Sequence, residues 1–248
     1  MITNALAGIG EYIIFVGRVL SKLPSLHKRH QEFIIQYKRI GLDSLFLISL
    51  TAAFTGLVTA LQAVYQSKGY IPTSLLSVLI GKSTMIELAP VLTALVLTGK
   101  VGASIAAEIG TMRVSEQLDA LRSMSIDPHE FLYMPRITAG FIAFPLITIF
   151  ADAIGILCAW YFSWLRYGIH HYTFFNNMRS YFEPTDLLGG LAKSFVFGFI
   201  ITTFACFHGN RCTGGAEGVG KATTLTVVYS AVAILVMDFM VAWALFGI

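Results

Sequence analysis

Residues 86–128, IELAPVLTALVLTGKVGASIAAEIGTMRVSEQLDALRSMSIDP, decide which fold this sequence adopts. The apolar run over residues 84–107 is long enough to cross a bilayer core of about 30 Å, at the rise of about 1.5 Å per helical residue. Its only ionised positions are Glu87, near one end, and Lys100. The stretch therefore begins as a membrane-spanning α-helix.

The second half of the stretch has the pattern of a short surface helix. Val114, Leu118 and Leu121 recur at helical spacing, and charged side chains occupy the rest of the circumference. The residue before Pro128 is disfavoured in the helical conformation, which ends the pattern. These features predict an amphipathic helix over residues 110–126, tightly coupled to the span before it.

Composition places the chain among integral membrane proteins. Of its 248 residues, 56% are hydrophobic and only 12% are charged, and the mean hydropathy is +0.72. These values exclude a soluble globular domain, and we expect one compact membrane domain over residues 1–248. The three cysteines have no C-x-x-C spacing, so neither a disulfide framework nor a zinc site is indicated.

The remaining segments complete an all-α integral membrane fold with five spans. Besides residues 84–107, the apolar runs suited to spans are 42–66, 137–165, 187–207 and 223–247. Charged residues interrupt the helical pattern of residues 1–40. This favours an N-terminal helix that lies in the membrane interface, followed by a basic juxtamembrane segment.

The distribution of lysine and arginine orients these spans. Most of the basic residues outside them fall on the side of the N-terminus. The positive-inside rule then places the N-terminus and the helix over 110–126 in the cytoplasm, and the C-terminus in the periplasm. Residues 66–82, with Gly69 and Pro72, are expected to form an outer connection. Residues 166–186 are expected to form a periplasmic loop or a short helix outside the membrane.

Two sequences similar to phosphate-binding loops do not predict a nucleotide site. The first, GKST from Gly81, has Leu76 where the motif requires glycine. The second, GAEGVGK from Gly215, has the correct spacing, but Ala222 replaces the hydroxyl residue that binds magnesium and no strand precedes the loop. We therefore expect no cofactor on this chain, and we expect ATP and magnesium to be used by a separate polypeptide.

Three ionised residues, Glu87, Lys193 and Asp238, fall inside the predicted spans. An unpaired charge at the bilayer centre costs about 2.5 to 3.5 kcal/mol, so these side chains are expected to face protein or water. Lys193 and Asp238 both lie about 10 Å from the outer ends of their spans at helical rise, which allows an ion pair. Either the pair is structural and joins two helices, or one of the three charges lines a binding cavity.

The sequence from Glu87, ELAPVLTALVLTGKVGASIAAEIGTMRVSEQLDAL, closely resembles the signature of the MlaE/YrbE permease family. These proteins are the membrane subunits of ABC-type lipid transporters that work with Mce-domain proteins. The resemblance implies a non-catalytic permease for phospholipid or a related lipid in the bacterial inner membrane. The partners it implies are a second copy of itself, cytoplasmic ABC ATPase subunits, a periplasmic Mce-domain protein and membrane lipid, but no nucleic acid.

The same resemblance implies which residues contact the ATPase and which line the lipid cavity. Periodicity alone leaves open whether the helix over 110–126 docks in an ATPase groove or packs on this protein's own cytoplasmic surface, and the resemblance favours docking as a coupling helix. The residues expected to meet the ATPase are Glu108, Gly110, Thr111, Met112, Arg113, Glu116, Gln117, Leu118, Asp119 and Leu121. Those expected to line a lipid cavity are Glu87, Leu88, Leu61 and Tyr65.

Two other functions are compatible with the sequence. A proton-coupled secondary transporter of an amphiphile could use Asp152, Glu87 or Asp238, although such folds usually show internal repeats and none is visible here. A non-transporting scaffold of an envelope complex would tolerate the loss of these charges. His170 and His171 lack a third ligand at recognisable spacing, so no metal site is expected.

Overall fold

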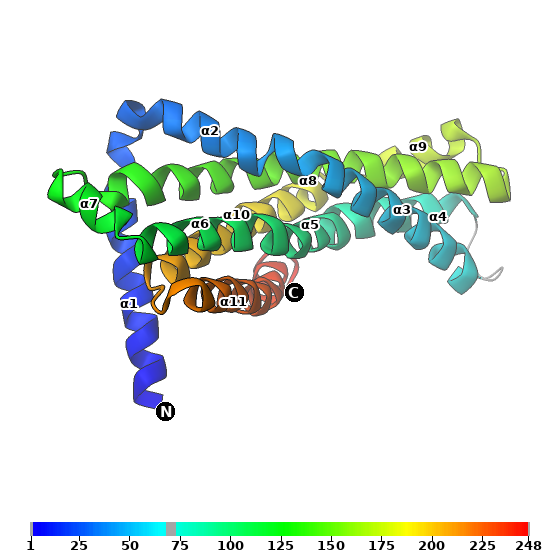
Figure 1. The fold of residues 1–248 in the computed structure, drawn as a ribbon. Helices are drawn as coiled ribbons and strands as arrows, with labels where there is room; N and C mark the ends of the chain where they lie inside the picture. Colours follow the sequence, from blue (N-terminus) through cyan, green and yellow to red (C-terminus); the bar gives the residue numbers. More distant parts are fainter. Residues whose placement is uncertain (1, 68–72, 248) are drawn as a thin grey trace. The chain divides into compact units, whose positions relative to one another are not determined.

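The computed structural model describes residues 2–67 and 73–247 of the chain (Figure 1). Within these ranges every regular element is a helix and no strand is present, which confirms the all-α prediction. Five segments are long and apolar enough to cross a membrane, which confirms the predicted number of spans. They are Leu23–Gln66, Leu75–Val114, His129–Tyr167, Pro184–Asn210 and Gly215–Leu245.

The chain divides into two compact units, and neither is continuous in sequence. Unit 1 comprises Met1–Asp43, Leu97–Ala143 and Phe197–Ile234. Unit 2 comprises Ser44–Val96, Phe144–Val196 and Leu235–Ile248. Three long helices contribute residues to both units, namely α8 (Met134–Tyr167), α10 (Pro184–Asn210) and α11 (Gly215–Phe246). The single domain expected over residues 1–248 stays a prediction, because the structure divides the chain into two sets of segments that alternate along the sequence.

Unit 1 contains the N-terminal elements and the amphipathic stretch. Its shorter elements are α1 (Ile2–Leu20), the 3₁₀ helix η1 (Leu23–Arg29), α2 (His30–Ile40), the π-helical turns η4 (Thr98–Gly102) and η5 (His129–Tyr133), α6 (Ala103–Val114) and α7 (Gln117–Ser123). Aromatic side chains hold α1 in place, because Tyr12 stacks on Phe204 at 4.7 Å and Phe15 lies 5.3 Å from Tyr133 between ring centroids.

Unit 2 is built around α3 (Leu45–Ser67), which follows the 3₁₀ turn η2 (Leu42–Ser44). The other short elements are α4 (Thr73–Ser83), the π-helical turn η3 (Thr84–Leu88), α5 (Ala89–Leu97) and α9 (His171–Ser180). Buried residues from α3, α4, α8 and α9 form its core, among them Ala60, Ile80, Ile156 and Phe174. Van der Waals packing of these side chains holds α4 and α9 against the longer helices.

Both predicted connections contain helices, and for residues 166–186 a short helix is one of the two expected forms. Residues 66–82 include α4, whose apolar side chains pack in the core, while Gly69 and Pro72 lie outside the described residues. Residues 166–186 include α9, and Phe174 on this helix is fully buried. Both helices are short and their apolar residues meet only in three dimensions, so neither produces a span-length signal in the sequence.

The amphipathic helix predicted over residues 110–126 is interrupted. Helix α6 continues to Val114, and α7 begins at Gln117 after Glu116, which has a left-handed backbone with φ of 60° and ψ of 11°. A non-glycine residue in this conformation breaks the helical hydrogen-bond ladder. The break leaves Val114 39% exposed and Leu118 fully buried, so the two do not form one apolar stripe.

Candidate functional site: an amphipathic groove and a buried charge cluster

A groove of about 880 Å³ lies between α3, α4, η3 and α5 in unit 2. Its lining residues are Thr51, Phe54, Thr55, Val58, Thr59, Gln62, Ala63, Gln66, Leu79, Ile80, Ser83, Leu88 and Leu92. None of these described residues is charged. The volume is in the range of small-molecule binding sites, and a mainly apolar wall with a few hydroxyl and amide groups suits an amphiphilic ligand.

The polar side of the groove comes from a repeat on α3. Thr51, Thr55 and Thr59 recur every four residues and therefore share one face of the helix. Each hydroxyl donates to the carbonyl four residues earlier at 2.8 Å, so these side chains are satisfied without a ligand. Their oxygens can still accept hydrogen bonds from a ligand.

The lining differs from the predicted cavity. Leu88 lies in the groove wall, but Leu61 and Tyr65 are not among the lining residues and are 49% and 66% exposed. The Glu87 side chain is directed to a lysine instead. The threonine repeat of α3, continued by Gln62 and Gln66, is the sequence signal that would have located this surface.

A buried charge cluster, which we define as Glu87, Lys193 and Asp238, joins three helical elements of unit 2. The Lys193 ammonium lies 2.5 Å from Glu87 Oε1 and 2.9 Å from Asp238 Oδ1. The Lys193 side chain is fully buried, whereas those of Asp238 and Glu87 are 21% and 43% exposed. Neither contact has hydrogen-bond alignment, so the attraction is that between opposite charges. The sequence suggested only the pair of Lys193 with Asp238.

The π-helical turn η3 connects the groove to this cluster. Pro90 has no N–H to donate to the carbonyl four residues earlier, and the Ala89 N–H bonds the Thr84 carbonyl five residues back. A widened turn next to a proline is the expected result. The last two residues of η3 point to different sites, because Glu87 contacts Lys193 and Leu88 lines the groove.

In unit 1, several predicted coupling residues belong to the internal structure. Glu108 bridges two arginines, with Oε2 2.5 Å from Arg39 and Oε1 2.6 Å from Arg136. Gly110 is buried against Cys212, and Leu118 is fully buried. These three residues are therefore engaged within their own chain.

The other predicted coupling residues lie on or near the surface of α6 and α7. Asp119 is central to them, because its Oδ1 accepts hydrogen bonds from Arg113 at 2.9 Å and from Arg122 at 3.1 Å. Thr111, Glu116 and Gln117 are exposed, and Met112 and Leu121 are partly exposed. The exposed positions form a mixed-charge surface with a few apolar atoms.

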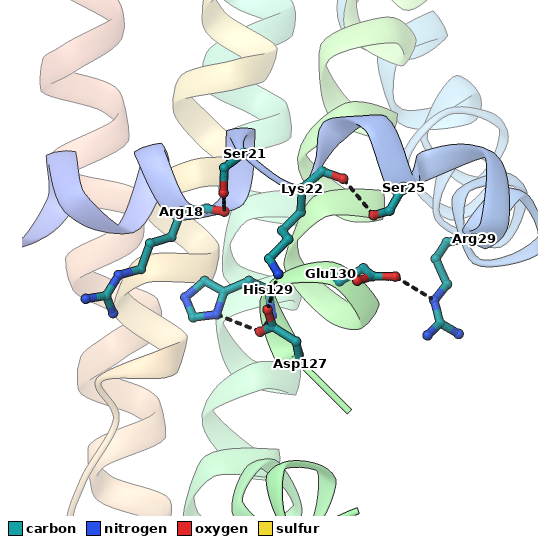
Figure 2. Close-up of polar contacts among 8 residues, drawn as sticks. All are labelled: Arg18, Ser21, Lys22, Ser25, Arg29, Asp127, His129 and Glu130. Atoms are coloured by element: carbon teal, nitrogen blue, oxygen red, sulfur yellow. Dashed lines mark hydrogen bonds and ion pairs between the residues drawn. The ribbon is translucent and has the colours of Figure 1, made fainter. Parts of the chain in front are cut away.

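The chain after α7 is tied to the N-terminal elements by a junction cluster of Lys22, Arg29, Asp127, His129 and Glu130 (Figure 2). The Lys22 ammonium lies 3.0 Å from Asp127 Oδ2, and Asp127 Oδ1 accepts a hydrogen bond from the His129 backbone N–H at 2.9 Å. Arg29 lies 3.7 Å from Glu130 and stacks over the Phe131 ring. Sequence reasoning missed this cluster.

The junction cluster shifts two pKa values. Partial burial acts to raise the pKa of Asp127, but the hydrogen bonds from the His129 N–H and Lys22 outweigh it, and the pKa is lowered. The hydrogen bond to Asp127 raises the pKa of Lys22. Both groups are therefore held in their charged forms at neutral pH.

Other candidate groups have no evident ligand. Asp152 is 6% exposed and its Oδ1 has no hydrogen-bond partner among the described residues. Within the same ranges, no group of three His, Cys, Asp or Glu side chains is placed to hold a metal ion. His170 and His171 are both exposed at the start of α9, and the three cysteines are free thiols.

Comparison with known proteins identifies the family. The family model described as Permease MlaE matches residues 33–244. A probable ABC transporter permease protein of Rickettsia felis is 38% identical over 242 residues, covering 97% of this chain and 93% of that protein. The Haemophilus influenzae protein named intermembrane phospholipid transport system permease protein MlaE is 31% identical over 259 residues, covering 100% and 99%.

A plant protein is also related. The chloroplastic protein TRIGALACTOSYLDIACYLGLYCEROL 1 of Arabidopsis thaliana is 33% identical over 229 residues, which cover 92% of this chain and 65% of that protein. The match of the family model over most of the sequence, together with relatives of similar length, is decisive. This chain belongs to the MlaE permease family.

Proposed function

We propose that this protein is the membrane permease of an ABC transporter that moves phospholipid or a related lipid between the inner membrane and the cell envelope. The observation that carries the proposal is the uncharged amphipathic groove of unit 2 in a member of the MlaE family. The name of the Haemophilus influenzae relative, which specifies intermembrane phospholipid transport, supports the substrate class. The lipid is carried and not chemically changed.

The energy for transport comes from cytoplasmic ATPase subunits in this proposal. The phosphate-loop-like sequence from Gly215 begins α11 directly and lacks the required hydroxyl residue, so this chain supplies no ATP site. We assign ATPase docking to the exposed residues of α6, α7 and the break between them, namely Thr111, Glu116, Gln117 and Asp119, together with the partly exposed Leu121. Binding of a helix in a groove is a common mode for such contacts.

The assembly has further members in the proposal. A second copy of this chain would enclose the lipid path, and a periplasmic Mce-domain protein would receive or deliver the lipid. The N-terminus lies in the cytoplasm and the C-terminus in the periplasm, as the excess of basic residues around α2 and α6 supports. Movement of the coupling segment, α6 and α7, then alters the groove as rigid helices shift.

The groove is tested by two matched tryptophan substitutions on α3. Val58 lines the groove and is 50% exposed, whereas Leu61 does not line it and is 49% exposed. Transfer of fluorescent phospholipid by the reconstituted complex is the measurement. We expect Val58→Trp to fill the groove and lower the rate by about tenfold or more, a barrier change of about 1.4 kcal/mol, while Leu61→Trp stays close to the native rate.

Equal transfer by Val58→Trp and the native complex would remove the groove from the lipid path. Recovery of the ATPase with each variant serves as the control for assembly. ATP-independent, proton-driven transfer by the permease alone would instead support a secondary transporter.

A further inference from the structure

A second pocket lies in unit 1, where α2 meets η4 and α6. Its volume is about 160 Å³, well above the roughly 10 to 15 Å³ that a single water molecule needs. Polar lining groups come from Gln36, Arg39 and Asp43 on one side and from Lys100 and Ser104 on the other. None of these residues lines the groove of unit 2.

Positive charge around this pocket exceeds negative charge by one, because Arg39, Lys100 and Arg136 are balanced only by Asp43 and Glu108. Glu108 lies between Arg39 and Arg136, at 2.5 and 2.6 Å, and Asp43 has no ion pair among the described residues. The Arg136 side chain is 3% exposed, and its Nε and Nη1 atoms have no hydrogen-bond partner among the described residues. The Glu108 carboxylate is therefore shared by the guanidinium groups of Arg39 and Arg136. Their remaining positive charge would stabilise an additional anion nearby.

Lys100 adds a further positive charge at the pocket wall. Its ammonium donates a hydrogen bond to the backbone carbonyl of Asp43, and no carboxylate of the described residues lies within 4.0 Å of it. An ammonium group has three donors, so two remain for a ligand. The π-helical turn η4 carries Lys100, and such turns are frequent at functional sites.

The surroundings of the pocket favour a lipid phosphate over a free anion. On α2 and just after it, Ile34, Ile35 and Leu42 are 58%, 56% and 56% exposed. These apolar side chains lie close in sequence to Arg39, which lines the pocket. An amphipathic helix with basic residues beside exposed apolar ones is typical of contact with anionic lipid at a membrane interface.

We propose that the pocket formed by Arg39, Lys100, Gln36 and Ser104 binds the phosphate group of an anionic phospholipid, in the leaflet next to α2. The phosphate oxygens accept hydrogen bonds from Lys100 and Arg39, and the acyl chains lie along the exposed side chains of α2. This lipid is bound as a structural ligand at a site separate from the transport groove.

The test is native mass spectrometry of the full-length chain released from nanodiscs that contain phosphatidylglycerol and phosphatidylcholine. We expect retained lipid to be mainly phosphatidylglycerol, and Lys100→Gln to reduce its retention by about fivefold, the effect of about 1 kcal/mol per basic residue. Lys100→Arg keeps the charge and should retain the lipid. Lys38→Gln removes an exposed lysine from the same helix as Arg39 without touching the pocket, and should behave as the native chain.

Four results would overturn the proposal, and the first three come from measurements of lipid retention. They are equal retention of the two lipids by the native chain, native retention of phosphatidylglycerol by Lys100→Gln, and equal losses in Lys38→Gln and Lys100→Gln. The first comparison needs no variant, so it holds even if Lys100→Gln fails to fold. Displacement of the retained lipid by millimolar inorganic phosphate would show a free-phosphate site and reject a lipid ligand. Because no transport is measured, failure here leaves the proposed transport function untouched.

Discussion

The Lys193 ammonium lies 2.5 Å from the Glu87 carboxylate, with the lysine side chain fully buried and the glutamate side chain 43% exposed. Asp238 completes the cluster from α11 at 2.9 Å. One buried cation thus holds together two carboxylates that would otherwise repel each other. Lys193 is therefore the residue on which the three helical elements depend most.

Replacing Lys193 should be more harmful than removing the whole cluster. Lys193→Met leaves two adjacent carboxylates without a partner, and we expect a loss of about 3 kcal/mol in the free energy of unfolding, at the low end for a buried pair because Glu87 is partly hydrated. The triple variant Lys193→Met, Glu87→Gln, Asp238→Asn should recover most of it. Denaturant titration in detergent measures both, and a triple variant no more stable than the single one would contradict the clustering.

The break between α6 and α7 predicts opposite effects of two substitutions at Glu116. Glycine adopts a φ of 60° freely, whereas a β-branched residue is strained there by about 1 to 2 kcal/mol. Glu116→Gly should preserve the break, and Glu116→Val should disturb the segment and reduce recovery of the ATPase on co-purification. Equal recovery of the ATPase with both variants would show that the backbone conformation at Glu116 does not matter for docking.

The junction cluster predicts a stability difference that depends on pH. The pKa of Asp127 is lowered in the folded protein, so its contribution is complete above its ordinary value of 3.8 and is lost as the pH falls through the folded value. Asp127→Asn keeps an amide oxygen that can accept the hydrogen bond from the His129 N–H but removes the negative charge that faces Lys22. It should therefore destabilise the protein slightly at pH 7, because the ion pair is largely hydrated, and the difference should disappear in acid.

Thermal unfolding of the native protein and Asp127→Asn across this pH range is the measurement. Lys22→Met should act in the same direction as Asp127→Asn, whereas Lys28→Met, which removes an exposed lysine with no ion pair among the described residues, should have little effect. A constant difference between native and Asp127→Asn down to the acid limit would argue against the charged form of Asp127 as its source.

The close approach of α3 and α8 in unit 2 predicts a strong dependence on Gly56. A Cβ at this position would overlap the backbone of Gly155, which has no side chain that could move aside. Gly56→Ala should cost about 1 to 3 kcal/mol, as overpacking does. Gly99→Ala is the matched control, because no atom lies within 4 Å of its added Cβ. Equal stability of the two variants would contradict this helix crossing.

The outline of the fold could be read from the sequence because each of its signals is local. A membrane span is indicated by a run of apolar residues, which is a property of about 20 consecutive positions. All five spans were predicted from such runs. Helix α4 was missed for the same reason, since it is shorter than a span and is stabilised by contacts such as those of Ile80 in a shared core. The segment of α9 could be assigned only as a loop or a short helix.

The sequence by itself determined that this is a five-span helical permease of the MlaE family, with isolated charges within its spans. Only the tertiary structure decided which partners those charges have, since Glu87 meets Lys193 through the crossing of separate helices and Asp127 meets Lys22 across a long separation in the chain. It also decided that the threonines of α3, and not Leu61 and Tyr65, line the groove, and that Leu118 is buried. Spans follow from local hydropathy, whereas ion pairs, groove walls and buried faces depend on how helices pack, which no single segment encodes.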